Sequence, residues 1–373
     1  MERARLHVSE RNDLGQNSIG VVHAKQERPP RGTPSPPRTR TRLVLLGTAG
    51  GSVYYAEQSR RGVGSAVVID GSIYLIDCGE GVAARYRQAG LGPPGFTHGL
   101  EDLQAVFFSH LHSDHTIGYP GLLVAGFLNG LRNRTEPIQI YGPGPRGSVK
   151  DMFADRPANI LVNPQNPMPG TADLTRDLLA AYATDLNERA LRRGSGANPE
   201  ASFDARDIQL PAGIEYELGG DPAPEMEPFA VHEDANVRVL ATLVDHRPAF
   251  PAFGFRFETP DGVIVFSGDT RPTPNVIRLA RGADILVHEV IAVPAMERLL
   301  VEPAARARLG DIASSHTAAD AVGSVASAAG VTKLVLSPVL PPTADDSDFD
   351  IVRATFAGEI VVGRDLDQIA VGR

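Results

Sequence analysis

Six consecutive residues carry four side chains that bind metal ions well. They form the run His110-Leu111-His112-Ser113-Asp114-His115, directly after the apolar segment Gln104–Phe108. Imidazole and carboxylate groups suit zinc and similar divalent ions. Because alternate residues of a tight loop point to different sides, His110 and His112 are predicted to face one ion, and Asp114 and His115 a second ion nearby. The whole chain has 10 histidines, so a chance cluster in a polar loop is the weaker interpretation.

Two ions need more ligands than this run supplies, so distant parts of the chain must contribute. Three later positions qualify. His246 and Asp269 each come directly after a predicted strand, and His316 comes directly before a predicted helix. A single histidine at a strand end is more often a surface or capping residue than a ligand, so local sequence alone does not assign these three.

The elements that must position these residues alternate between strand and helix patterns. Strands are predicted at 42–46, 65–69, 73–76, 104–108, 138–141, 237–244, 252–258, 263–266, 285–287 and 333–336. Helices are predicted at 80–89, 116–131, 174–192, 274–281 and 318–330. Asp70-Gly71 between the second and third strands is typical of a hairpin turn. The mixture of hairpins and strand–helix alternation predicts a layered α/β sandwich with mixed sheets.

The N-terminal segment of the chain differs in composition from the rest. Residues 1–41 include the stretch Arg28-Pro29-Pro30-Arg31, which cannot bury apolar surface, so we predict a disordered Pro/Arg-rich tail. A basic arm for an anionic partner is the alternative interpretation. Residues 42–373 are predicted to form one domain, with an insertion at about 150–225 that is rich in proline, glycine and polar residues.

Composition and charge exclude several protein classes. The net charge of −9 and the pI of about 5.6 argue against a protein that coats nucleic acid. Cys78 is the single cysteine, which excludes an internal disulfide and a cysteine-rich zinc site. No apolar run reaches the roughly 18 residues of a membrane span, and the N-terminus lacks a signal-peptide core. The sequence therefore predicts a cytoplasmic protein without membrane attachment.

Several motifs together resemble the metallo-β-lactamase superfamily, in the branch that includes ribonuclease Z and arylsulfatase-like hydrolases. They fall in the family's order and span about residues 42–373. The histidine run is highly specific, whereas the other motifs are specific mainly in combination. The matching segments are Leu46-Gly47-Thr48, Ile76-Asp77-Cys78-Gly79-Glu80-Gly81, Phe108-Ser109-His110-Leu111-His112-Ser113-Asp114-His115, Tyr141-Gly142-Pro143, Asp245-His246-Arg247-Pro248 with Phe253-Gly254-Phe255-Arg256, Ser267-Gly268-Asp269-Thr270 and Val287-His288-Glu289.

The resemblance implies a four-layer αββα sandwich and a role for each site residue. It implies that His110, His112 and His246 bind the first ion, that Asp114 and His115 bind the second, and that Asp269 bridges the two. Asp77 and Glu289 would support the ligands by hydrogen bonds. Asp114 and His316 would be catalytic, with His316 stabilising developing negative charge or protonating the leaving group. A metal-bound water or hydroxide would be the nucleophile. The implied cofactor is one or two Zn²⁺ ions, with Mn²⁺ or Fe²⁺ as alternatives.

One position departs from the family pattern. After the strand at 333–336 the family usually has a histidine that completes the second ion site, but this chain has Pro338. Proline cannot bind a metal through its side chain. Either a water fills the gap, or Asp345 or Asp346 reaches in, or only one ion binds tightly.

The resemblance leaves three functions open. The first is hydrolysis of a small-molecule ester, lactone, sulfate or phosphodiester. The second is a ribonuclease Z-like endonuclease that acts at the 3′ end of tRNA. We rank the small molecule first and expect no nucleic-acid partner, because the chain is acidic and has no room for a long arm between Phe255-Arg256-Phe257-Glu258 and the Asp269 motif.

The third function is a degenerate or single-metal relative, possibly containing iron, with a binding or oxidative role. Fold alone does not decide among these functions. A homodimer is a further expectation, because dimers are common among the relatives.

Overall fold

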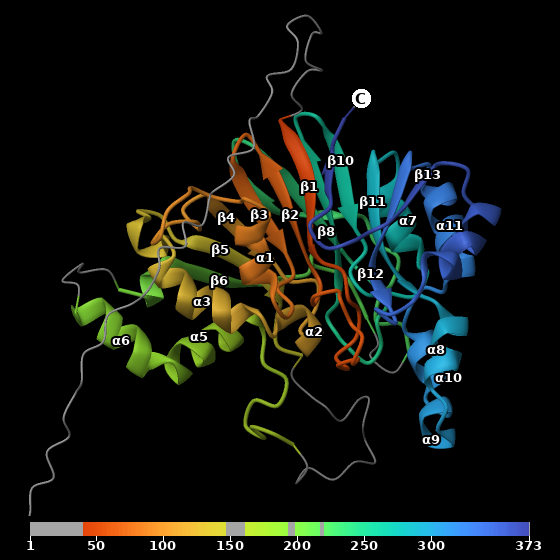
Figure 1. The fold of residues 1–373 in the computed structure, drawn as a ribbon, viewed down its shortest axis with the longest axis horizontal. Coiled ribbons are helices and arrows are strands. Elements are labelled where there is room, and N and C mark those ends of the chain that lie inside the picture. The colour runs from red at the N-terminus through yellow and green to blue at the C-terminus, as the bar shows by residue number, and fades with distance from the viewer. Residues whose placement is uncertain (1–39, 147–160, 193–197, 217–219, 373) are drawn as a thin grey trace, which may run out of the picture. The chain divides into compact units, whose positions relative to one another are not determined.

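Two β-sheets form the centre of the fold (Figure 1). The computed structural model describes residues 40–146, 161–192, 198–216 and 220–372. Within these residues each sheet has seven strands. The first sheet has the order β14 (Gln368–Ala370), β1 (Thr41–Gly47), β2 (Gly64–Ile69), β3 (Ser72–Ile76), β4 (Leu103–Phe107), β5 (Ile138–Pro143) and β6 (Phe203–Ile208). The second has the order β13 (Glu359–Val362), β12 (Lys333–Leu340), β11 (Ile285–Ile291), β10 (Gly262–Phe266), β9 (Phe253–Thr259), β8 (Arg238–Leu243) and β7 (Phe229–Glu233).

Helices cover the outer face of each sheet (Figure 1). On the side of the first sheet lie α1 (Val82–Gln88), α3 (Tyr119–Leu128), α5 (Thr171–Ala181) and α6 (Ala183–Arg192). On the side of the second sheet lie α7 (Pro274–Ala280), α11 (Ala319–Ala329) and the 3-10 helix η4 (Asp346–Ala354). The remaining short helices are α2 (Ser113–Thr116), α8 (Val293–Leu299), α9 (Pro303–Arg306), α10 (Leu309–Ser314), η1 (Leu131–Asn133) and η3 (Glu200–Ser202).

The alternation of side chains along each strand explains the layers. In β1, Leu43 and Leu45 join the core between the two sheets, whereas Val44 and Leu46 join the core beneath α1 and α3. Both sets are fully buried. A strand between a second sheet and a helix layer needs apolar side chains on both faces. The predicted four-layer αββα sandwich is therefore confirmed.

The strand directions bring the predicted site residues to one edge. β3, β4 and β5 are parallel neighbours in the first sheet, and β10, β11 and β12 are parallel neighbours in the second. The loop after β4 carries the histidine run, and the loop after β10 carries Asp269. Loops at the carboxyl ends of parallel strands commonly form binding sites, because these ends meet at the same edge.

Two predicted helices are divided in the structure. Within the helix predicted at 116–131, Thr116 ends α2 and the main helix is α3, and Gly118 lies between the two. A Cβ atom at Gly118 would lie 2.0 Å from the backbone oxygen of Gly79, so only glycine fits this close approach. Pro120 lies in the first turn of α3, where its missing N–H leaves no backbone bond unmade. The helix predicted at 174–192 is α5 followed by α6.

The described part of the predicted insertion contributes a strand to the first sheet. Its strand β6 pairs in parallel with β5 over the whole length of both strands. Of the predicted tail, residues 1–39 lie outside the described residues, and Thr41 already begins β1.

Candidate metal centre

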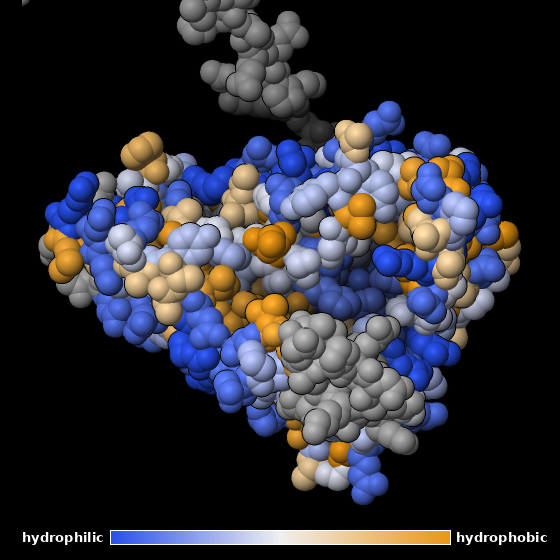
Figure 2. All heavy atoms as spheres, turned by 90° about the horizontal axis from the view of Figure 1, so that it is seen from below, coloured by the Kyte–Doolittle hydropathy of each residue, from blue (hydrophilic) through white to orange (hydrophobic). Residues whose placement is uncertain are grey.

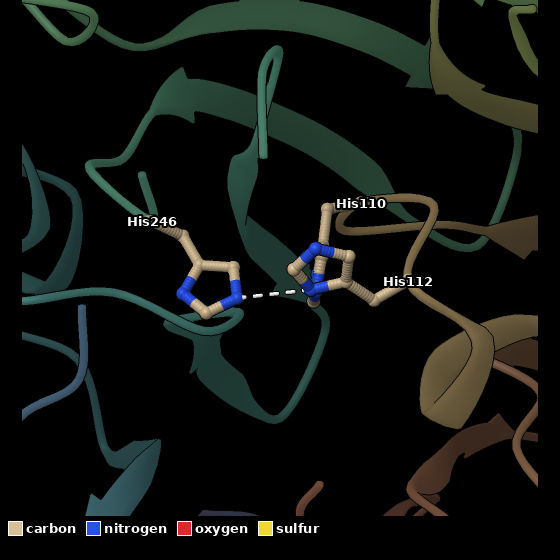
Figure 3. Close-up of side chains that lie close together, drawn as sticks. All are labelled: His110, His112 and His246. Atoms are coloured by element: carbon tan, nitrogen blue, oxygen red, sulfur yellow. Dashed lines mark hydrogen bonds between the residues drawn. The ribbon is translucent and has the colours of Figure 1, made fainter. Parts of the chain in front are cut away.

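Three histidines from two distant loops converge on one point (Figure 3). Nδ1 of His112 lies 3.0 Å from Nε2 of His110 and 3.2 Å from Nε2 of His246. His110 and His112 follow β4, and His246 follows β8, 134 residues beyond His112. Nitrogen lone pairs at such distances repel one another unless a proton or a cation lies between them.

Backbone and side-chain hydrogen bonds decide which nitrogens face this point. Nδ1 of His246 lies 2.9 Å from the carbonyl oxygen of Ser315 and must donate to it. The hydroxyl of Ser109 donates to Asp77, so it accepts from Nδ1 of His110 at 3.1 Å. Both histidines therefore keep the lone pair on Nε2, the nitrogen that faces His112. This orientation by a second partner is the usual arrangement around metal-binding histidines.

Asp269 faces histidines on two sides. Its Oδ1 lies 3.3 Å from Nε2 of His115, and its Oδ2 lies 3.7 Å from Nε2 of His246. Nδ1 of His115 donates to Asp77 at 2.9 Å, so Nε2 is the nitrogen that faces Asp269. Among the described residues, neither His115 Nε2 nor Asp269 Oδ1 has a hydrogen-bond partner, although both are buried. Buried polar atoms without partners are costly, and a cation between them would satisfy both.

The donor atoms form three groups that could each hold a metal ion. In each group the donor atoms lie within 4.8 Å of one another. The groups are His110 with His112 and His246, His110 with His115 and Asp269, and His246 with Asp269 and His316. The residues therefore fit a divalent ion by donor type, and Zn²⁺, Mn²⁺ and Fe²⁺ all accept imidazole and carboxylate ligands.

Burial and charge set the protonation of these ligands. Burial lowers the pKa of His110, His112 and His246, so all three favour the neutral form that binds metal. Burial would also lower the pKa of His115, but the carboxylates of Asp269, Asp77 and Asp114 raise it well above its usual value. Burial opposes ionisation of Asp269, yet the surrounding histidines hold its pKa well below the usual range. The position between His115 and Asp269 therefore attracts positive charge.

His316 is held by Glu289 at the edge of the same site. Its Nδ1 lies 3.2 Å from Oε1 of Glu289 and 3.9 Å from Oδ2 of Asp269. The same Glu289 oxygen accepts the backbone N–H groups of Thr270 and Thr317 at 3.1 and 3.0 Å. Burial opposes the charged imidazole, but Glu289 and Asp269 outweigh it and raise the pKa of His316 to about 9.

Asp114 lies next to the three groups of possible metal ligands but belongs to none of them. Its Oδ2 is 3.7 Å from Nε2 of His115 and accepts the backbone N–H of Gly51 at 2.9 Å. Its Oδ1 accepts the hydroxyl proton of Ser52 at 3.0 Å. Asp114 is thus oriented by the loop that follows β1, which sequence reasoning did not connect with the site.

Neither Asp345 nor Asp346 replaces the histidine that the family usually has at the position of Pro338. Pro338 lines a small cavity together with Asp77 and His115, as expected for the position next to a second ion. Asp346 is paired with Arg364 at 2.8 Å, and Asp345 caps η4 through a reciprocal capping box. The suggestion that Asp345 or Asp346 reaches into the site is therefore wrong, because both carboxylates are used elsewhere.

A cavity of about 570 Å³ opens beside the metal groups. Figure 2 shows this face of the molecule, which is hollowed near its middle, with apolar residues close to the hollow. Its lining includes the polar residues Asp114, Asp269 and His316. The apolar part of the lining consists of Met296, Leu299, Leu300, Ile312 and Leu340.

Comparisons with known proteins place the chain in a family. No protein-family model matches it. A ribonuclease Z of Mycobacterium sp. (strain KMS) is 31% identical over 333 residues, which cover 88% of this chain and 95% of that protein. The chain belongs to the ribonuclease Z family. This membership also makes it a metal-dependent hydrolase of the metallo-β-lactamase superfamily.

Solved structures support the same fold for this family member. The metallo-β-lactamase fold protein YhfI from Bacillus subtilis has a TM-score of 0.53 at 16% identity and covers 88% of this chain and 98% of its own. The short form of human tRNase Z has a TM-score of 0.54 at 18% identity and covers 89% and 100%.

The comparisons correct the expectation about partners. A small-molecule substrate without nucleic acid was expected, but the relatives are ribonucleases by name, and one structural neighbour is a tRNase. The expectation relied on the lack of room for a long arm and on net charge, which is a sum over the chain and does not describe the surface near a site. In the part of the chain that the structure describes, no helix is long and apolar enough to cross a membrane.

Several residues that shape the site were missed by sequence reasoning. Ser109 and Ser315 orient the histidines, and Thr270 and Thr317 anchor Glu289. Each lies next to a predicted site residue in the sequence, and this adjacency was the only signal that could have found them.

Proposed function

We propose that this chain is a metal-dependent endoribonuclease of the ribonuclease Z type, which hydrolyses a phosphodiester bond at the 3′ end of tRNA precursors. The observation that carries the proposal is the position of Asp269 between His115 and His246. A carboxylate between two ligand groups suits a pair of ions, and such pairs catalyse phosphodiester hydrolysis in many nucleases. The ribonuclease names of the relatives agree with this chemistry.

The ligand roles follow from the groups. His110, His112 and His246 would hold a first ion, and His115 and Asp269 a second. Asp114, which lies beside His115 but outside the groups, would be a further ligand for the second ion. Bound divalent ions would activate water and neutralise negative charge on the phosphate. Asp77 keeps His115 oriented through its hydrogen bond to Nδ1.

His316 is assigned the role of proton donor. Its raised pKa keeps a proton on the imidazole at neutral pH, and Glu289 fixes the ring by accepting from Nδ1. Both ring nitrogens then carry an N–H, and His316 lines the cavity together with Asp269. As water adds to phosphorus, the Asp114 carboxylate would accept its proton, and the leaving oxygen would take a proton from His316 as its bond to phosphorus breaks.

The test uses the full chain purified without chelator and a tRNA precursor that carries a 3′ extension. Wild type should release the extension, and His112→Ala should lose both metal and cleavage. His98→Ala is the matched control, because His98 is half-exposed and pairs with Glu101 away from the site. Metal-loaded wild type that leaves the precursor intact would overturn the proposal, and so would an His112→Ala variant that cleaves at the wild-type rate.

A further inference from the structure

A second cavity adjoins the metal-facing one. It has a volume of about 350 Å³ and shares two wall residues, His112 and Pro248, with the larger cavity. His112 is also one of the three histidines that converge at the candidate metal centre. A substrate whose reacting bond lies at the metal groups therefore has room for its neighbouring part in this second cavity.

The walls of the second cavity suit a flat, mostly apolar group attached to an anion. Leu111, Met168, Leu174 and Phe250 supply apolar surface. Among the described lining residues, the one with a permanent charge is Arg146, and no carboxylate is present. Cavities of this size with apolar walls and a few polar groups are typical of sites for small aromatic groups. A group that carries a phosphate meets no repulsion from these walls.

Phe250 is held in place relative to the metal centre. It lies between His246 and β9, in a turn closed by a 2.9 Å bond from the Ala249 N–H to the His246 carbonyl. The Val244 N–H donates to the Ala252 carbonyl across the same turn, also at 2.9 Å. The ring of Tyr216 lies against Phe250, with ring centroids 4.5 Å apart. The turn that carries a metal-facing histidine therefore also fixes an aromatic ring in the wall of the second cavity.

We propose that this second cavity binds one unpaired nucleobase of the RNA, next to the phosphodiester that is cleaved, and that Phe250 is the stacking surface for this base. The inference rests on the proposed ribonuclease function. Unpaired RNA bases are commonly recognised by stacking on aromatic side chains, because every base presents a flat π-face. Phe250 is thus a residue that positions the RNA, whereas His112 and His246 act at the reacting bond.

The first test combines a change in the protein with a change in the RNA. Wild type, Phe250→Ala and Phe250→Tyr are assayed on the tRNA precursor and on the same RNA with an abasic nucleotide on either side of the cleaved bond. Phe250→Ala should lower kcat/KM by about tenfold on normal RNA, and Phe250→Tyr should restore it. With the abasic nucleotide at one of the two positions, kcat/KM of wild type should fall by a similar factor. At that position kcat/KM of Phe250→Ala should not fall further. If the loss of kcat/KM from Phe250→Ala and the loss from the abasic nucleotide multiply at both positions, the proposal is overturned.

Phe96→Ala is the matched control for removal of an aromatic ring. Phe96 is 97% exposed and does not line either cavity, so this variant should cleave like wild type. Metal content should be equal in all four proteins, which separates a loss of stacking from a loss of the metal centre.

A binding measurement separates this inference from the proposed function. Metal-loaded wild type and Phe250→Ala are titrated calorimetrically with adenosine 5′-monophosphate, which requires no cleavage. A roughly tenfold weaker affinity of Phe250→Ala supports the base site even if the tRNA precursor is not cleaved. Equal affinities would overturn the base site even if the precursor is cleaved.

Discussion

Oδ1 of Asp269 lies 3.3 Å from Nε2 of His115, and both atoms are buried without a hydrogen-bond partner among the described residues. The two residues come from different sheets, since His115 follows β4 and Asp269 follows β10. Buried polar atoms without a hydrogen-bond partner are costly, and a cation bound by both atoms would remove that cost. This pair is therefore the place where a bound cation should have the largest effect on stability and activity.

Asp269→Asn should reduce metal content and abolish the thermal stabilisation that metal gives. The substitution removes the negative charge that faces both His115 and His246, although the side chain keeps its size. The checks are elemental mass spectrometry and Tm with and without chelator. Asp70→Asn is the control, because Asp70 lies in the hairpin turn with φ 48°, where asparagine is also tolerated. Unchanged metal content in Asp269→Asn would rule out a bridging role.

His316→Asn should lower kcat by about 100-fold or more and leave metal content nearly unchanged. The expected loss follows from the proton that Glu289 helps His316 to hold. Single-turnover cleavage and metal analysis on the same preparation provide the check. His316 also belongs to a possible metal group with His246 and Asp269. Loss of one ion per chain would therefore identify it as a ligand and not as a proton donor.

Pro338→His should raise the number of tightly held ions per chain. Pro338 lines the same small cavity as His115 and Asp77, so a new imidazole there would lie next to the second ion position. The stoichiometry after dialysis against a weak chelator measures this effect. Pro338→Ala is the matched control, because it removes the proline without adding a ligand. Two tightly held ions in wild type would show that the second position needs no histidine.

Asp234→Asn should lower the free energy of unfolding at pH 7 and have less effect at acidic pH. Partial burial opposes ionisation of Asp234, but hydrogen bonds from Tyr74, Asn236, His232 and Val237 lower its pKa below the usual value. A depressed pKa means that the stabilisation is present above the unfolded pKa of about 3.9 and is lost as the pH falls through the folded value. The two proteins should therefore converge toward pH 3.

Urea unfolding at pH 7, 5 and 3 measures this convergence. Tyr74→Phe is the companion variant, because it keeps the Asp234 carboxylate and removes the 2.7 Å bond from the Tyr74 hydroxyl to it, together with the 3.4 Å bond from Asn236 to that hydroxyl. Tyr74→Phe should lower the free energy of unfolding at pH 7 by less than Asp234→Asn does. A difference between wild type and Asp234→Asn that stays constant over the three pH values would contradict the assigned cause.

Periodicity identified most strands that carry the site, and it failed where strands are short or polar. β4 and β10 are predicted nearly at their observed bounds, because each is a continuous apolar run. β6 (FDARDI) and β7 (FAVHE) were not predicted, because both are edge strands with mostly half-buried or exposed residues. An edge strand needs little apolar sequence, so its pattern resembles that of a loop.

The sequence by itself determined the donor types of the metal centre and the order in which they occur along the chain. The run from His110 to His115 shows its chemistry within six residues, because four of them carry donor side chains. The alternation expected for a tight loop was wrong, because Ser113–Thr116 form α2. His246 and Asp269 were placed only by resemblance, since nothing in their local sequence distinguishes a ligand from a capped strand end.

Only the tertiary structure decided which atoms face one another. The 3.2 Å approach of His246 to His112 depends on how the two sheets stack, as does the facing pair of Asp269 and His115. The cavity beside Phe250 likewise exists only because the turn after β8 packs against the loops after β4 and β5. Such short distances join residues that are more than 100 positions apart in the chain. They are set by the packing of whole layers of the fold. Local patterns carry no information about them, because they describe only which faces of an element are buried.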